Sequence, residues 1–110
     1  MKKEITGNIG KIKLEGRIDI SNSGKLKEML YDLKDKGMKK IIIDMDGLEY
    51  IDSSGLGRIF YFFADYKKEN GIMEIHNVSN SNVKKVIEIV KLDKIITIKY
   101  IFIYIKKAKV

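Results

Sequence analysis

Three segments of the chain carry apolar residues at the spacing of a helix that buries one face. In each segment, four apolar residues fall at positions i, i+3, i+4 and i+7, and in the first segment charged residues fill most of the other face. The three stripes are Leu26, Met29, Leu30 and Leu33; Leu56, Ile59, Phe60 and Phe63; and Val83, Val86, Ile87 and Val90. The pattern predicts three amphipathic helices that pack against a common core.

Residues that cap helices flank these segments. Asn22 or Ser21 precedes the first, the run 52–55 (Asp-Ser-Ser-Gly) precedes the second, and the polar cluster 79–82 precedes the third. Gly37 and Gly71 are placed to end the first two helices. We therefore expect the second helix to run from about Ser54 to Asn70, with two serine hydroxyls near its N-terminus.

Short apolar runs between the predicted helices are typical of strands. Ile41 to Ile43 is β-branched and apolar on both faces, which suits an interior, parallel strand. Residues 4–16 predict two short strands joined by a tight turn, one of them at a sheet edge, and residues 72–78 predict another strand. Residues 44–47 (Asp-Met-Asp-Gly) break the apolar pattern and predict a loop after the central strand.

The order strand–strand–helix–strand–helix–strand–helix–strand predicts an α/β fold. We expect a mixed sheet whose later strands are parallel and joined by right-handed crossover helices. A length of 110 residues suits one domain, 1–110.

The C-terminal segment fits this scheme least well. Residues 95–105 are mostly apolar on both faces and have strong strand propensity. Either the final strand extends through this run, or Ile101 to Ile105 packs in another way. An exposed run of this kind is an aggregation or dimerisation hazard, against which the flanking Lys106, Lys107 and Lys109 would act as gatekeepers.

Composition narrows the possible chemistry. The chain has no cysteine and one histidine, His76, which excludes disulfides, thiol chemistry and multi-histidine metal sites. We expect neither a metal nor a cofactor, and a structural or solvent-facing role for His76.

The positive charge does not form a nucleic-acid footprint. The formal net charge is +7, but five lysines lie near the chain ends, and without them 17 basic and 15 acidic residues remain. A nucleic-acid-binding protein concentrates its positive charge in a stripe on a recognisable fold. We therefore expect no direct binding of nucleic acid.

No segment approaches the roughly 20 apolar residues of a membrane-spanning helix. The first residues also lack the apolar core of a secretory signal. We expect no membrane insertion and a cytoplasmic location.

Catalytic signatures are missing. Ile51, not glycine, stands two residues before Ser53, so the Gly-x-Ser-x-Gly elbow of hydrolases is absent. The sequence 55–57 (Gly-Leu-Gly) is too short for a dinucleotide fingerprint, and no Walker-type lysine follows it. Asp44 and Asp46 are paired in sequence, but nothing in the pattern brings them together on a substrate. We expect a protein that is not an enzyme.

The sequence Asp52-Ser53-Ser54-Gly55-Leu56-Gly57 follows a hydrophobic strand, and residues 16–19 (Gly-Arg-Ile-Asp) lie upstream of it. Together these resemble the anti-sigma factor antagonist family, the STAS domains of bacteria. The resemblance extends from about Ile9 to Ile98, is most specific in residues 51–57, and does not cover the last ten residues. One departure is Lys91, where relatives often carry glycine.

The resemblance implies a phosphorylation switch. It makes Ser53 the serine that a dedicated kinase phosphorylates and places Asp19 near it. The unphosphorylated form would bind an anti-sigma factor that is itself the serine kinase, and so release a sigma factor; a serine phosphatase would reverse the modification. The residues expected to meet the partner are Asp19, Asp52, Ser53, Ser54, Gly55, Gly57 and Phe62, and we expect Gly55 and Gly57 to shape the corner.

Several alternatives stay open at this point. Aspartate and serine before a helix are usually capping residues alone. A STAS-type module in a transporter-accessory or stress-signalling assembly would carry a serine that is never phosphorylated, and a lipid- or nucleotide-binding domain is a third class. Phe62 and Tyr66 either widen the buried face of their helix or form an exposed apolar patch that a partner covers.

Overall fold

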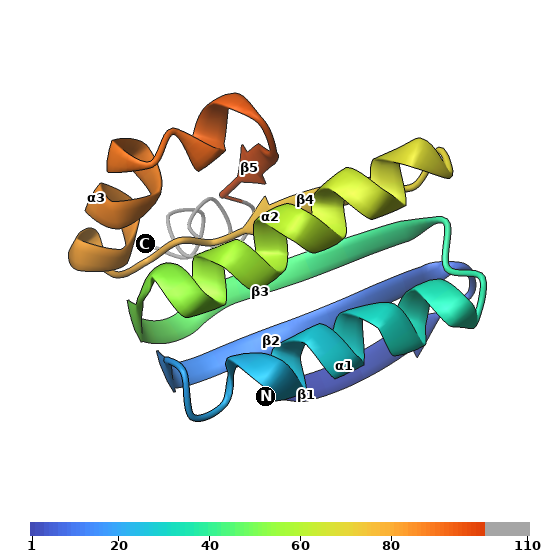
Figure 1. The fold of residues 1–110 in the computed structure, drawn as a ribbon, viewed down its shortest axis with the longest axis horizontal. Coiled ribbons are helices and arrows are strands. Elements are labelled where there is room, and N and C mark those ends of the chain that lie inside the picture. Colours follow the sequence, from blue (N-terminus) through green and yellow to red (C-terminus); the bar gives the residue numbers. More distant parts are fainter. Residues whose placement is uncertain (101–110) are drawn as a thin grey trace, which may run out of the picture.

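The computed structural model describes residues 1–100 as a five-stranded mixed sheet with helices packed along one face (Figure 1). The strands lie in the sheet in chain order: β1 (Lys2–Thr6), β2 (Ile9–Ile18), β3 (Lys40–Ile51), β4 (Ile72–His76) and β5 (Thr97–Lys99). The helices are α1 (Ser23–Asp35), α2 (Ser53–Lys68), α3 (Ser81–Ile89) and the short 3₁₀ turn η1 (Leu92–Lys94). The expectations for residues 101–110 lie outside the described residues.

The sheet confirms the predicted α/β fold class. β1 pairs with β2 in antiparallel fashion, and β2, β3, β4 and β5 are parallel to their neighbours. Right-handed crossovers place α1 and α2 side by side over the same face (Figure 1). The C-terminal ends of β2, β3 and β4 therefore lie at one end of the sheet, where α1, α2 and α3 begin.

Alternation along the strands divides the sheet into two faces. Ile12, Leu14, Ile41 and Ile43 are fully or almost fully buried within the core that α1 and α2 complete. The alternate positions of these strands and of β4 point to the opposite face and are mainly charged: Lys11, Lys13, Asp44, Glu74 and His76. The central strand is thus apolar on one face and only half-buried at Ile42 on the other.

The predicted loop at residues 44–47 is wrong, because β3 continues through it to Ile51. Met45 and Leu48 are buried and extend the inward-facing series of the strand, while the carboxylates face away from α1 and α2. The pairing register between β2 and β3 shifts after Lys13, as it does at a β-bulge. Asp44 and Asp46 are tolerated within β3 because neither α1 nor α2 covers the face of the strand to which they point.

Of the two alternatives for Phe62, the structure supports the widened buried face, so the expected contact of Phe62 with a partner is wrong. Phe62 is 0% exposed and belongs to the core. Its ring packs edge-on against Tyr31 of α1, with ring centroids 5.0 Å apart, and stacks on Tyr66 at 5.3 Å. Phe60, which we placed in the buried stripe, is 40% exposed instead. Helix α2 is rotated so that Phe62 meets α1, and a partner cannot reach this ring without opening the core.

Candidate functional site

Two neighbouring strand ends bring the predicted site residues together. Ile18, the last residue of β2, is paired with Ile51, the last residue of β3. The amide of Asp52 donates a 3.2 Å hydrogen bond to the carbonyl of Ile18. Asp19 and Asp52, the residues that follow the two strands, therefore lie on adjacent loops at the end of the sheet where α1 and α2 begin.

Asp52 caps helix α2 as predicted. Its Oδ1 accepts hydrogen bonds from the amides of Ser54, at 3.0 Å, and Gly55, at 3.3 Å. The Ser54 hydroxyl donates to the same oxygen. This hydroxyl bond is the largest cause that lowers the pKa of Asp52, and the two amides lower it further against the opposing effect of burial.

Ser53 differs from the serine beside it. It is the first residue of α2 and is exposed, whereas Ser54 is half-buried. The hydroxyl of Ser53 makes no hydrogen bond to any other group within residues 1–100, while that of Ser54 is engaged by Asp52. Of the two adjacent serines, Ser53 is therefore the one whose hydroxyl is unengaged among the described residues.

Asp19 organises the neighbouring loop. Its Oδ1 accepts a 2.9 Å hydrogen bond from the amide of Ser21 and a 2.5 Å bond from the Ser21 hydroxyl. These bonds lower the pKa of Asp19, although the nearby charge of Asp52 acts in the opposite direction. The negative charge of Asp52 thus acts on Asp19, and each carboxylate is held in its charged form by local donors.

The two glycines of the motif have different roles. A Cβ on Gly55 would lie 2.7 Å from Cγ2 of Ile18 and 2.8 Å from Cγ1 of Ile51. Glycine at this position lets α2 approach the ends of β2 and β3 closely. A Cβ on Gly57 would meet no atom of residues 1–100 within 4 Å, so Gly57 does not shape the corner as we expected.

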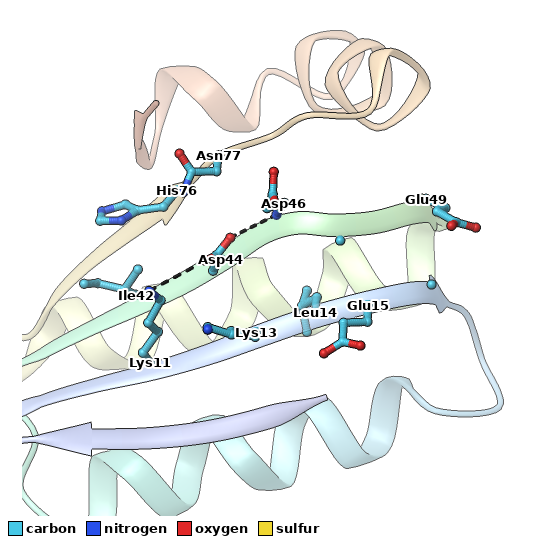
Figure 2. Close-up of a pocket in the computed structure, with 12 residues that line it drawn as sticks. Lys11, Lys13, Leu14, Glu15, Ile42, Asp44, Asp46, Glu49, His76 and Asn77 are labelled. Carbon is cyan, nitrogen blue, oxygen red and sulfur yellow. Dashed lines mark hydrogen bonds and ion pairs between the residues drawn. The ribbon is translucent and has the colours of Figure 1, made fainter. Parts of the chain in front are cut away.

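A hollow of about 800 Å³ lies on the sheet face away from α1 and α2 (Figure 2). Lys11, Asp44, Asp46 and His76 are among the residues that line it, and Lys11 Nζ lies 3.6 Å from Asp44 Oδ2. None of the predicted site residues lines this hollow. Within residues 1–100, no cluster of histidine, aspartate and glutamate residues has the arrangement of a metal site.

Sequence reasoning missed a charged cluster beside this hollow. Glu74 is only 7% exposed, and its carboxylate lies 3.1 Å from the amino groups of both Lys40 and Lys99 and 2.9 Å from Nε2 of His76. The cluster links β3, β4 and β5. The sequence feature that indicates this cluster is a glutamate between apolar residues of a predicted strand. A glutamate that is buried at such a position needs positively charged partners.

No helix in the part of the chain that the structure describes is long and apolar enough to cross a membrane.

A family model for the STAS domain matches residues 1–102 of the chain. Solved structures share the fold. A Thermotoga maritima protein described as an anti-sigma factor antagonist superposes with a TM-score of 0.82 at 22% identity, covering 99% of this chain and 94% of that one. A sulfate transporter family protein of Wolinella succinogenes gives a TM-score of 0.75 at 18% identity, covering 97% and 89%.

A third related structure is the phosphorylated form of SpoIIAA, a cell fate determinant of Bacillus. It gives a TM-score of 0.72 at 18% identity and covers 97% of each chain. SpoIIAA is an anti-sigma factor antagonist whose structure is also known without the phosphate. At these identities the likeness establishes the fold, and the same fold serves both signalling and transporter proteins.

Proposed function

Because the chain belongs to the STAS domain family, we propose that it is an anti-sigma factor antagonist whose partner binding is switched by phosphorylation of Ser53. The observation that carries this proposal is the exposed hydroxyl of Ser53 at the first turn of α2, which has no hydrogen-bond partner within residues 1–100 and lies next to a serine whose hydroxyl is already engaged. The partner is an anti-sigma factor that is also a serine kinase, and a serine phosphatase restores the unmodified form.

The corner around Ser53 suits a switch that acts on binding and leaves the fold unchanged. A phosphate adds about −1.5 to −2 charges at neutral pH. The dipole of α2 favours an anion at this end of the helix, where Asp52 already accepts from the amides of Ser54 and Gly55. Ser53 is exposed, so the phosphate requires no repacking of the core.

The same charge would weaken a docked complex. Asp19 and Asp52 lie on the adjacent loops, so a phosphate adds to existing negative charge, and any carboxylate of the partner would be repelled. A dianion would also lose water when an interface closes over it. A loss of about 4 kcal/mol reduces affinity roughly a thousandfold, which is enough to separate the complex in a cell.

The surface that meets the partner comprises Asp19, Asp52, Ser53, Ser54 and the helix face at Gly57, with Gly55 setting the distance between α2 and the strands. Phe62 does not belong to it, because its ring is buried. In this function the chain is the substrate of a kinase and has no catalytic role of its own, and it acts in the cytoplasm, where sigma factors bind RNA polymerase.

The direct test is the intact mass of the protein after incubation with ATP and each anti-sigma factor kinase encoded in the source genome. We expect one added phosphate on the parent protein, one on Ser54→Ala, and none on Ser53→Ala. A phosphate that persists on Ser53→Ala, or a parent that no kinase modifies, contradicts the assignment. Ser53→Asp should in addition bind the kinase much more weakly than the parent.

The second candidate is a STAS interaction module in a transporter-accessory or stress-signalling assembly. The structural likeness to the Wolinella sulfate transporter family protein favours it. In that case Ser53 would stay unmodified by every kinase of the panel, and the gene would lie beside transporter genes. An adjacent gene for an anti-sigma kinase would favour the first proposal.

A further inference from the structure

Ile20 is the most exposed large apolar side chain among residues 1–100, with 84% of its surface accessible. It lies in the loop between β2 and α1, directly after Asp19. Ile20 and Ser53 are each within two residues of the hydrogen bond that joins Asp52 to Ile18. The isoleucine therefore belongs to the same corner of the molecule as the proposed phosphorylation site.

The loop that carries Ile20 is held by hydrogen bonds on both sides of it. Asp19 Oδ1 accepts from the Ser21 amide at 2.9 Å, and the Asp19 carbonyl accepts from the Ser23 amide at 2.8 Å. The Asn22 side chain accepts from the Asp19 amide at 2.9 Å and donates to the Arg17 carbonyl at 2.8 Å. The backbone around Ile20 is thus fixed before any partner arrives.

This arrangement uses groups that would ordinarily cap a helix. Asn22 is the N-cap residue of α1, yet its side chain makes no bond to the first turn of that helix. It fastens the loop instead. A single exposed isoleucine is common on protein surfaces. Because the backbone of this turn is already fixed, however, little backbone conformational entropy is lost when a partner buries Ile20.

We propose that Ile20 is the apolar anchor of the surface around Ser53 and inserts into an apolar pocket on the protein that distinguishes the two states of Ser53. This inference rests on the proposed function, since it adds the contact chemistry of the same partner. An apolar pocket excludes water from the corner. A phosphate on the neighbouring helix start would therefore be desolvated when the complex forms, which strengthens the switch.

The test compares affinities for the anti-sigma factor kinase that phosphorylates the parent, measured by calorimetry without ATP. Ile20→Ser should weaken binding about tenfold to a hundredfold, the effect of burying one isoleucine side chain, and Ile20→Val about fourfold. The heat-capacity change of binding should become less negative in Ile20→Ser. The matched control is Ile72→Ser: Ile72 is 57% exposed but begins β4, at the opposite end of the sheet from Ser53, and its substitution should leave the affinity unchanged.

The outcomes separate the two proposals. If the kinase binds Ile20→Ser as tightly as the parent, the anchor is overturned and the phosphorylation switch stands. If no kinase of the panel binds the parent, both are overturned. If the parent forms a dimer that Ile20→Ser abolishes while kinase binding is unchanged, Ile20 contacts a second copy of the chain and the proposal is wrong. Because Ile20 is exposed, the variants should unfold at the same temperature as the parent.

Discussion

The Ser54 hydroxyl donates a hydrogen bond to Oδ1 of Asp52, the oxygen that also accepts from the amides of Ser54 and Gly55. The hydroxyl of the second serine of the motif is therefore part of the helix cap. Ser53, one residue earlier, is exposed and has no such bond within residues 1–100. One carboxylate therefore makes two adjacent serines chemically different, and the hydroxyl that it leaves unengaged is the one for which we propose phosphorylation.

The cap predicts how Asp52 variants behave. Asp52→Ala should lower the free energy of unfolding by about 1 kcal/mol, because the first-turn amides and the Ser54 hydroxyl lose their acceptor. Asp52→Asn should retain most of this stability, since an amide oxygen also caps helices well. Chemical denaturation of the three proteins measures both effects. An Asn variant as unstable as the Ala variant would show that the negative charge at the helix start, and not the acceptor oxygen, provides the stabilisation.

The packing of α2 onto the strand ends predicts a large effect at Gly55. The added methyl group of Gly55→Ala would overlap Ile18 and Ile51, and overpacking of this kind typically costs about 1–3 kcal/mol. The melting temperature should fall accordingly.

Gly57→Ala is the matched control for Gly55. It lies two residues further along the same helix, where a methyl group meets no neighbouring atom of the described chain within 4 Å. Alanine in a helix is about 1 kcal/mol more favourable than glycine, so this variant should be more stable than the parent. Equal destabilisation of the two variants would contradict the close approach at Gly55.

The regular parts of the fold follow from the sequence. The apolar spacing correctly placed all three helices, and the cap at Asp52 was evident from the run of capping residues before Leu56. These features are local, since a helix and its cap are set by residues within a few positions of one another. The neighbourhood of Asp19 and Asp52 came from the family resemblance, because strand pairing joins residues distant in the chain.

The errors arose where burial depends on tertiary neighbours. Asp44 and Asp46 indicated a loop, but β3 continues because the face that carries them is not covered by α1 or α2. Helix α2 buries Phe62 against Tyr31 of α1 and exposes Phe60, and no local pattern in α2 specifies this contact with another helix. The hydrogen bonds that fix Ile20 likewise depend on the turn that the chain adopts between β2 and α1.

The charged cluster around Glu74 predicts acid sensitivity. Burial raises the pKa of Glu74, but hydrogen bonds from His76, Lys99 and Lys40 outweigh it and lower the pKa to about 2, from 4.5 for a free side chain. A carboxylate whose pKa is depressed by folding stabilises the protein above about pH 4.5, and this stabilisation is lost as the pH falls toward 2. Its size is on the order of 3 kcal/mol. In Glu74→Gln, stability should be lower at pH 7 and should depend less on pH between 4.5 and 2, as measured by urea denaturation.

A surface carboxylate provides the comparison for Glu74. Glu69 lies 2.6 Å from the amino group of Lys34, but its side chain is 60% exposed. Exposed ion pairs contribute little to stability, so Glu69→Gln should leave the pH dependence almost unchanged. A Glu74→Gln curve that parallels the parent between pH 4.5 and 2 would contradict the role of the cluster.

The backbone at Lys91 predicts a stabilising substitution. Lys91 follows α3 with φ of 59°, a left-handed conformation that favours glycine. This conformation costs a residue with a side chain roughly 1–2 kcal/mol, whereas glycine adopts it freely but makes the unfolded chain more flexible, which offsets about 0.4–1 kcal/mol. Lys91→Gly should therefore raise the free energy of unfolding by about 0.5–1 kcal/mol.

The control is Lys85→Gly, at an exposed helical position within α3, which should instead lower the free energy of unfolding by about 1 kcal/mol. Thermal and urea denaturation measure both, and a loss of stability in Lys91→Gly would mean that the lysine side chain makes contacts that outweigh the strained backbone.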